Sequence, residues 1–257
     1  MMPERIICLS AESADWLWRI GAWDRVVGVT AFFTIPRNCE PKPRISGFST
    51  ARIKEITKLK PDLIITFSDV QAESARELIR MGFTVLATNQ RSLAEIETTL
   101  ALIARAAGRE QDGARLLAEF HKRLAPLRKV KVRPRTYFEE WNNPLVSGIG
   151  WVGELIERAG GRDIFEELRG KRLAADRVIS REQVCERDPE VILASWCGLP
   201  VRMPEIKARP GWHNVTAVRN QQLHEIPGED ILQPGFRLVI GYERIRQIFE
   251  RLVAGEK

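Results

Sequence analysis

The sequence is poor in the residues that hold metals and form disulfides. Its 257 residues include only four cysteines and three histidines. The cysteines show neither a CxxC pair nor the spacing of a zinc site, so we expect free thiols at Cys8, Cys39, Cys185 and Cys197. No histidine falls at the end of a predicted strand, which disfavours axial metal ligation. We therefore expect no metal site and no intrinsic cofactor.

Long apolar runs are also absent. No stretch is apolar enough to span a bilayer, and the first residues, MMPE, lead at once into an apolar segment without the basic region, apolar core or cleavage site of a secretory signal. As written, the sequence predicts a cytoplasmic protein without membrane insertion. A periplasmic or cell-surface location is the alternative if a leader has been removed.

What is present is an ordinary globular composition, with 44% hydrophobic and 29% charged residues and a formal net charge of +6. The basic residues are spread along the chain without a nucleic-acid-reading motif or interleaved aromatic residues. A nucleic acid is therefore not an expected partner. We expect a monomer that binds a small molecule.

Short apolar segments alternate with amphipathic ones in both halves of the sequence. In the first half we predict strands at 5–10, 25–30, 62–67 and 84–87 and helices at 13–20, 51–59, 71–81 and 93–107. In the second half we predict strands at 135–140, 190–195 and 223–226 and helices at 151–159, 181–187 and 237–254. Strands that alternate with helices form parallel sheets with right-handed crossovers. The predicted fold class is therefore α/β, with two Rossmann-like βα lobes.

A long helix is predicted between the two halves, over residues 110–131. Its apolar residues recur at three- and four-residue spacing on one face, at Leu117, Phe120, Leu124 and Leu127. A helix of this length is a rod of roughly 30 Å, long enough to join two lobes, although Pro126 predicts a kink or an earlier end. We divide the chain into an N-terminal α/β lobe (1–108), an interlobe helix (109–131) and a C-terminal α/β lobe (132–257). An ordinary packed helix within a single domain is the alternative.

The two halves also repeat a short motif. Residues 61–65 (PDLII) and 189–193 (PEVIL) lie 128 positions apart, and each follows a helix with an apolar residue at the matching place, Ile56 or Val184. Two lobes built alike indicate a bilobed protein with its ligand between them. Chance recurrence of helix–proline–strand units in α/β proteins is the alternative.

Several longer segments resemble a known family. They are RIICLSAESADWLWRIGAWDRVVGVT and ISGFSTARIKEITKLKPDLIIT in the first half, and SGIGWVGELIERAGGRDIF, VISREQVCERDPEVILAS and ILQPGFRLVIGYERI in the second. In this order they resemble the cobalamin-binding branch of the class III substrate-binding proteins, whose relatives bind ferric siderophores and haem for ABC importers. The resemblance implies two lobes joined by one rigid helix, with a corrinoid (cobalamin-like) ligand held between them for uptake or intracellular handling. A ferric siderophore or haem is the alternative ligand.

The same resemblance implies which residues bind the ligand. Aromatic residues that follow strands would flank a flat macrocycle; these are Phe32, Phe48 and Phe67 in the first lobe and Trp141, Trp151 and Trp196 in the second. Polar contacts would come from Ser10, Glu12, Ser68, Asn143, Glu229, Asp230 and Gln233. Each of these residues, taken singly, is as readily explained as part of a core, a surface or a turn.

One departure from the family concerns docking on an ABC permease. Importer-type members carry a surface glutamate on each lobe, and Glu182 occupies that place in the second lobe. In the first lobe the aligned residue is Lys54, and Glu55 is turned about 100° away around the helix. The missing carboxylate favours a binder or carrier in the cytoplasm over ordinary docking on an importer.

An enzyme or cofactor-assembly protein on the same two-lobed scaffold is the alternative of another class. Residues 148–153 spell GxGxxG, but the first glycine does not directly leave the strand that ends near Trp141. Glu139 and Glu140 are adjacent in a strand, so they point to opposite faces and cannot form an acid–base pair. We therefore expect no catalytic residues.

Overall fold

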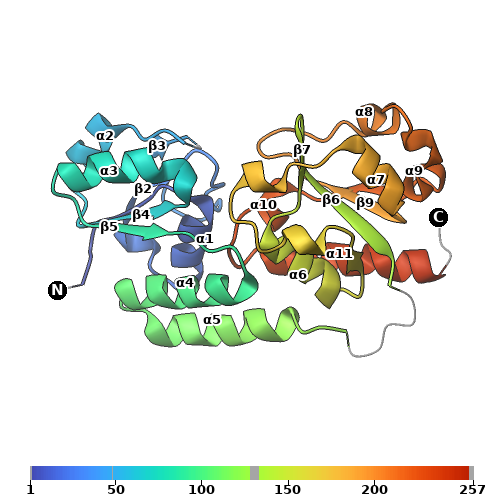
Figure 1. Cartoon of the computed structure of the whole chain (residues 1–257). Coiled ribbons are helices and arrows are strands. Elements are labelled where there is room, and N and C mark those ends of the chain that lie inside the picture. The colour runs from blue at the N-terminus through green and yellow to red at the C-terminus, as the bar shows by residue number, and fades with distance from the viewer. Residues whose placement is uncertain (1, 48, 128–132, 255–257) are drawn as a thin grey trace. The chain divides into compact units, whose positions relative to one another are not determined.

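The chain folds into two compact units, Met1–His121 and Lys122–Lys257, which we call the first and second units. This computed structural model describes residues 2–47, 49–127 and 133–254. Each unit is a layered α/β structure in which helices cover a mainly parallel sheet (Figure 1). The predicted fold class is confirmed.

The sheet of the first unit has five strands in the order β3-β2-β1-β4-β5, and all described pairings in it are parallel. The strands are β1 Ile6–Cys8, β2 Val26–Thr30, β3 Arg44–Ser46, β4 Leu63–Phe67 and β5 Val85–Thr88. Only β3 was not predicted. The central strands β1 and β4 are mostly apolar and almost entirely buried, as expected for a sheet that is covered on both faces.

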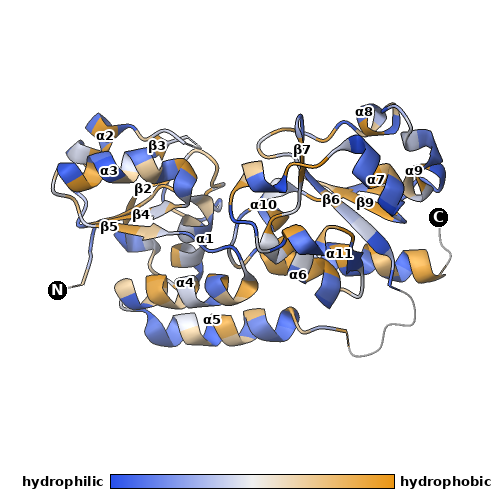
Figure 2. Cartoon of the chain, in the orientation of Figure 1, coloured by the Kyte–Doolittle hydropathy of each residue, from blue (hydrophilic) through white to orange (hydrophobic). Residues whose placement is uncertain are grey.

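Helices pack on this sheet through their apolar faces. They are α1 Ala11–Arg19, α2 Ile53–Lys58, α3 Ala72–Arg80, α4 Leu93–Ala106 and α5 Glu110–Arg123, with short 3₁₀ turns η1 Trp23–Arg25 and η2 Asp69–Gln71. Ser92 caps α4 by accepting a hydrogen bond from the Glu95 amide at 3.2 Å. Figure 2 shows hydrophobic residues along the strands and mixed colour along α4 and α5. A side chain at Gly113 would collide with Ala104, so glycine permits the close packing of α5 on α4.

The helix predicted over 110–131 is shorter than expected, because α5 ends at Arg123 and residues 124–127 are not helical. Pro126 explains the early end, since it has no amide proton and collides with the preceding helical turn. The freed backbone is bonded elsewhere: the Tyr242 hydroxyl donates to the Ala125 carbonyl at 2.7 Å. The rest of the predicted helix lies outside the described residues. Its role as a rigid link between lobes stays a prediction.

The sheet of the second unit runs in the order β10-β9-β6-β7, with β8 paired to β6. Its strands are β6 Arg135–Asn142, β7 Leu145–Ser147, β8 Arg162–Asp163, β9 Val191–Ala194 and β10 Leu223–Glu225. Strand β7 was not predicted, and it pairs antiparallel with β6. The GxGxxG sequence therefore follows an antiparallel strand, which is not the setting of a dinucleotide fingerprint.

The helices of the second unit are α6 Gly150–Arg158, α7 Arg181–Arg187, α8 Met203–Lys207, α9 Thr216–Arg219, α10 Gly228–Ile231 and α11 Leu238–Ala254. Between them lie the 3₁₀ turns η3 Glu166–Leu168, η4 Ala174–Arg177 and η5 Trp212–Asn214. The segment 199–218, for which no helix or strand was predicted, contains α8 and α9, which the buried side chains of Ile206, Trp212 and Ala217 anchor to the core. In the described parts of the chain, we find no helix with the length and apolarity needed to cross a membrane.

The sequence repeat corresponds to a structural repeat at the amino end of each sheet. In the first unit, the guanidinium of Arg5 donates to the carbonyls of Leu59 (2.6 Å) and Lys60 (3.2 Å), and its amide donates to Asp62 at 3.0 Å. Lys60 has a φ of 45°, which is rare for a residue with a side chain. The arginine thus holds the turn between α2 and β4.

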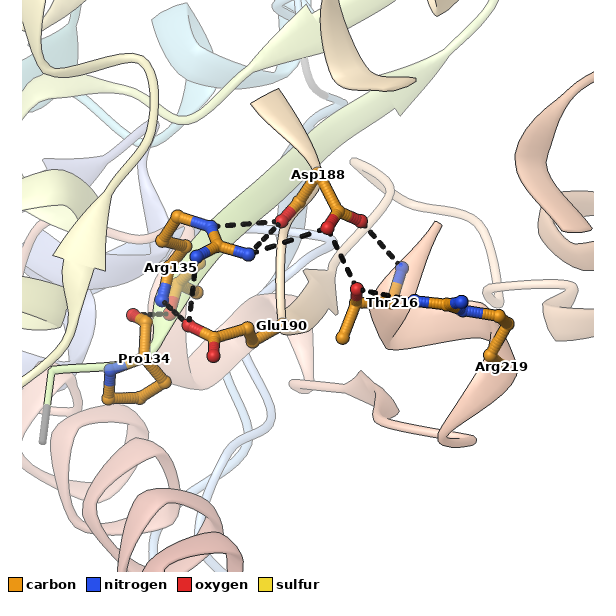
Figure 3. A network of polar contacts seen from close by, with 7 residues as sticks. Pro134, Arg135, Asp188, Glu190, Thr216 and Arg219 are labelled. Carbon is orange, nitrogen blue, oxygen red and sulfur yellow. Dashed lines mark hydrogen bonds and ion pairs between the residues drawn. The ribbon is translucent and has the colours of Figure 1, made fainter. Parts of the chain in front are cut away.

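The second unit has an equivalent clamp at the turn between α7 and β9, and this turn lies 128 positions after the one in the first unit (Figure 3). The guanidinium of Arg135 donates to the Asp188 carbonyl at 2.8 Å, and its amide donates to Glu190 at 2.9 Å. Asp188 has a φ of 41°, like Lys60. Its carboxylate also accepts hydrogen bonds from the amide and hydroxyl of Thr216, at 2.7 and 2.8 Å. Burial opposes ionisation, but these hydrogen bonds and the charge of Arg135 outweigh it and lower the pKa of Asp188.

Candidate ligand-binding site

Open parallel sheets bind ligands at the edge where the strands end. In the first unit this carboxyl edge consists of residues 9–13, 31–33, 67–71 and 88–91, which follow β1, β2, β4 and β5. Several of the residues proposed from the sequence lie there. We describe the corresponding edge of the second unit separately.

Two aromatic rings mark the carboxyl edge of the first unit. Phe32 directly follows β2 and its side chain is 49% exposed, an unusual state for so large an apolar group. Phe67 ends β4, is half-buried, and has the guanidinium of Arg91 over its ring at 5.4 Å. Phe33 is buried against Trp23 instead. Phe48 lies outside the described residues.

Ser68 borders a hollow of about 590 Å³. Its backbone has a φ of 62°, and its hydroxyl accepts a hydrogen bond from the Val70 amide at 3.3 Å. The lining comes from the ends of β4 and β5 and from one face of α3, and it comprises Thr66, Ser68, Asp69, Ala72, Ala75, Arg76, Ile79, Arg80, Ala87, Thr88 and Asn89. The hollow therefore combines an apolar floor with hydroxyl, amide and guanidinium groups.

Glu12 lies in the first turn of α1 and is only 5% exposed. Its Oε1 atom is buried without a hydrogen-bond partner in the described structure. Burial raises the pKa of the carboxyl group to about 7, an effect that a hydrogen bond with Ser10 offsets in part and that the charge of Asp15 increases. Burial also raises the pKa of the neighbouring Cys8 thiol to about 12, so this cysteine is not a reactive thiolate.

Two glutamines complete this edge, and sequence reasoning found neither. Gln71 is saturated within the chain, because its side chain accepts from the Phe67 amide at 3.0 Å and donates to the Leu9 carbonyl at 2.9 Å. Gln90 is 2% exposed, and its Oε1 atom has no partner among the described residues. Its position in the sequence could have identified Gln90 as a candidate, because it lies in the loop between the end of β5 and the N-cap of α4, at the carboxyl edge of the sheet.

The tryptophans proposed in the second unit lie mostly in its core. Trp151 is buried in α6 and donates to the Ile231 carbonyl at 2.9 Å. Trp196 is 2% exposed and donates to Glu139 at 3.0 Å. Trp141 is half-buried and donates to the Asn143 carbonyl at 3.0 Å. Of the three, Trp141 offers the most exposed ring; a role in ligand stacking stays a prediction for each.

The two adjacent glutamates of β6 form ion pairs with different arginines. Glu139 is fully buried and accepts from Arg209 at 2.8 Å in addition to Trp196. Glu140 accepts from both terminal nitrogens of the buried Arg177, at 2.6 and 3.0 Å. Each carboxylate thus has its own arginine within the unit.

The polar residues proposed around α10 also form ion pairs. The guanidinium of Arg237 donates to Asp230 at 2.6 Å and to Glu229 at 2.8 Å. Arg244 adds a contact of 3.3 Å to Asp230, which is almost fully buried. Glu229 is exposed and Gln233 is partly exposed, so these two side chains remain accessible.

The residues considered for permease docking lie on the surfaces of their units. Glu182 is exposed in the first turn of α7, where the backbone amides of the helix start and the hydroxyl of Ser180 lower the pKa of its carboxyl group. Lys54 is exposed in α2. No group of three or more histidine, cysteine or acidic side chains that could hold a metal ion occurs among the residues that the structure describes.

A family model described as periplasmic binding protein matches residues 6–229. The chain belongs to the periplasmic binding protein family. This family consists of substrate-binding proteins, and its members with known structure share the two-lobed fold described above. The family resemblance found in the sequence is thereby confirmed.

Two relatives and two solved structures illustrate the range of the family. An uncharacterized ABC transporter substrate-binding lipoprotein of Bacillus subtilis, YvrC, is 22% identical over 95% of this chain and 79% of its own length. The vitamin B12-binding protein of Vibrio campbellii is 25% identical over 75% of this chain and 70% of its own length. A possible iron-binding protein from Staphylococcus epidermidis superimposes with a TM-score of 0.81, at 20% identity over 97% of this chain and 99% of that one. The haem-binding protein RhuT from Roseiflexus sp. RS-1 superimposes with a TM-score of 0.78, at 20% identity over 96% of this chain and 97% of that one.

The two solved structures show the fold alone, because they are too distant in sequence to transfer a ligand. The general role of substrate binding follows from the family model. Ligand binding is what the family has in common. The identity of the ligand has to be argued from the residues of this chain.

Proposed function

We propose that this protein binds a corrinoid at the carboxyl edge of the first unit, for uptake or for handling within the cell. The observation that carries the proposal is the exposed ring of Phe32 at the end of β2, at the same edge as the half-buried ring of Phe67. Large aromatic rings that are partly exposed at a strand end suit a flat, bulky and partly apolar ligand. The relatives that are named vitamin B12-binding proteins support this choice.

A haem or ferric siderophore binder is the second candidate, favoured by the haem- and iron-binding proteins that share the fold. Arg76 and Arg80 line the hollow beside Ser68, and such cations would suit an anionic ligand. Arg76 pairs with Glu73, however, and both side chains are largely exposed to water. This arrangement gives an anion little advantage over solvent.

The proposal is tested by titrating the purified protein with dicyanocobinamide, haem and a ferric hydroxamate while tryptophan fluorescence is followed. Saturable quenching by the corrinoid at lower concentration than by the other two is the expected result. Replacing Phe32 by alanine should weaken corrinoid binding about fivefold, the loss of one aromatic contact. Met81 is a matched control, because it is also exposed but ends α3 at the opposite edge of the sheet. No saturable corrinoid response would refute the proposal.

Transport through an ABC permease is a further part of the proposal. Glu182 is placed to meet a basic partner, whereas α2 presents Lys54 at the matching position. We expect Lys54→Glu to strengthen association with a permease that already accepts the second unit. Unchanged association after this substitution would show that Lys54 is not at a docking surface.

A further inference from the structure

Two buried acceptor atoms stand out at the carboxyl edge of the first unit, which are Oε1 of Glu12 and Oε1 of Gln90. The side chains are 5% and 2% exposed, respectively. They belong to different segments, since Glu12 follows β1 and Gln90 follows β5. A buried acceptor without a donor loses the hydrogen bond that water would give it, so a folded protein retains such a group only at a cost.

Neighbouring polar groups at the same edge do not share this property. The Ser13 hydroxyl donates to the Ser10 carbonyl at 2.9 Å, and the Thr88 hydroxyl donates to the Thr66 carbonyl at 2.9 Å. Gln71 uses both ends of its amide within the chain. Among these polar side chains, the acceptor atoms without a hydrogen-bond partner are therefore those of Glu12 and Gln90.

The arginines of this edge are engaged within the chain. Arg44 donates to the carbonyls of Thr30 and Phe33, and Arg91 donates to Asp69 at 2.7 Å. Around Glu12, the charged neighbour that acts on it is Asp15, which itself pairs with Arg19 at 2.7 Å. This setting disfavours an anionic group of a ligand next to Glu12 and favours one that donates hydrogen bonds.

We propose that Glu12 and Gln90 are specificity residues of the ligand site that accept hydrogen bonds from the N–H groups of an uncharged carboxamide. The inference rests on the proposed function, because carboxamides surround the rim of a corrinoid. Haem presents propionate oxygens instead, and hydroxamate or catecholate siderophores present oxygen atoms already committed to iron. The periphery of haem therefore supplies no carboxamide N–H donor of this kind.

The test compares two corrinoids, of which only one carries N–H donors at its rim. One is dicyanocobinamide, which carries peripheral carboxamides, and the other is a corrinoid whose carboxamides are replaced by methyl esters and which has no N–H donors at the rim. We expect the wild-type protein to bind the amide at least about tenfold more tightly than the ester. Glu12→Leu and Gln90→Leu should each lower the affinity for the amide about fivefold and leave that for the ester unchanged.

Two further variants separate recognition from folding. Glu12→Gln keeps an acceptor oxygen and should retain the preference for the amide. Ser13→Ala removes a buried hydroxyl whose hydrogen bonds lie within the chain, and it should also retain the preference. In the absence of ligand, Glu12→Leu and Gln90→Leu should raise the melting temperature, because each removes an unpaired buried acceptor. A purely structural role would lower it.

The outcomes distinguish this inference from the proposed function. If the wild-type protein binds neither corrinoid, the proposed function is refuted, and so is the inference that Glu12 and Gln90 recognise a corrinoid carboxamide. If it binds amide and ester equally well, corrinoid binding stands and the inference is overturned, with buried water as the partner of both acceptors. A lower melting temperature of both leucine variants would overturn the inference as well.

Discussion

The two units are alike at the amino edges of their sheets and different at the carboxyl edges. At the amino edges, Arg5 and Arg135 clamp turns in which Lys60 and Asp188 adopt the same rare backbone conformation. At the carboxyl edges, the second unit pairs its buried carboxylates with arginines, whereas the first leaves acceptors open on Glu12 and Gln90. The sequence motif that the two units share thus stabilises their scaffold. The residues in which the units differ lie at the carboxyl ends of the strands.

This difference teaches which buried charges are structural. Glu139 is surrounded by donors from Arg209 and Trp196 within its own unit, so its ionised form is fully compensated. Burial raises the pKa of the Glu12 carboxyl group to about 7, and no cation is among the described groups that shift this pKa. The pair of Glu139 stabilises the fold only when it is complete, whereas the unpaired buried carboxyl group of Glu12 lowers stability.

The largest effect is expected from breaking the buried pair of the second unit. Arg209→Met leaves the fully buried Glu139 without its guanidinium, so the free energy of unfolding should fall by about 3–5 kcal/mol. Urea denaturation of the purified variant measures this loss. Arg202→Met is the matched control, because Arg202 pairs with Glu205 at the surface and should contribute below about 1 kcal/mol. Equal losses for the two variants would contradict the assignment of Glu139 as a compensated buried charge.

The second prediction concerns Glu12 and pH. Below pH 4.5 the carboxyl group is protonated in both the folded and unfolded chain; as the pH rises toward 7 the unfolded chain ionises first, so stability falls. Above pH 7 the full loss of about 3 kcal/mol is reached. Glu12→Gln removes this titration, so its advantage over the wild-type protein should grow between pH 4.5 and pH 8 in parallel urea titrations.

The charged and titratable groups that influence Glu12 are the same in both proteins, namely Asp15 on its own helix and Cys8 on β1. Asp163 in the second unit also has a raised pKa, owing mainly to burial, and its contribution cancels in the comparison. A constant difference between the wild-type protein and Glu12→Gln across this pH range would show that Glu12 has an ordinary pKa.

Much of this architecture could be predicted from the sequence because it depends on local signals. The helix at 181–187 was found with its observed bounds, since Ser180 is a strong N-cap and Val184 marks its buried face. Short elements such as α8, α9 and β7 were missed, because tertiary contacts hold them rather than their own propensities. The fold class follows from the alternation of elements, which survives such local errors.

The candidate site was predictable only in part. The sequence located the strand ends, and with them Phe32, Phe67 and Ser68. It could not show that the ring of Trp196 turns into the core to meet Glu139, because a tryptophan after a strand has the same sequence signature whether it faces inward or outward. Nor could it show that Gln71 is saturated while Gln90 is not, since that difference depends on groups distant in sequence.

A moderate effect is expected from the arginine clamps. Arg135→Met removes the donors to the Asp188 carbonyl and should lower the free energy of unfolding by about 1–3 kcal/mol, as for other hydrogen bonds from charged groups. Arg5→Met should cost a similar amount in the first unit, where the guanidinium makes the equivalent bonds. Thermal unfolding followed by circular dichroism measures both. A large loss for one clamp and none for the other would show that the amino edges are not equivalent.

The smallest effect concerns the helices α2 and α7, which precede the repeated strands. Ser180 and Gln183 form a complete capping box at the start of α7, whereas the N-cap residue of α2, Arg52, provides no side-chain cap. The matching residue at the third helical position, Glu55, is already present in α2. Arg52→Ser should therefore supply a side-chain N-cap and raise the free energy of unfolding by about 0.5–1 kcal/mol.

The converse substitution, Ser180→Ala, should lower the free energy of unfolding by about 1 kcal/mol, because it leaves the Gln183 amide without its acceptor. The gain at Arg52 should be the smaller of the two, since its ψ of 76° differs from the 162° at Ser180 and the backbone must turn before a serine can reach the amide. Urea denaturation resolves changes of this size when the variants are measured side by side. If Arg52→Ser destabilised the protein, the hydrogen bond from the Arg52 amide to the Ile45 carbonyl would hold the backbone at the start of α2 in its present conformation. The helices α2 and α7 would then match in their sequence positions but not in the way they are capped.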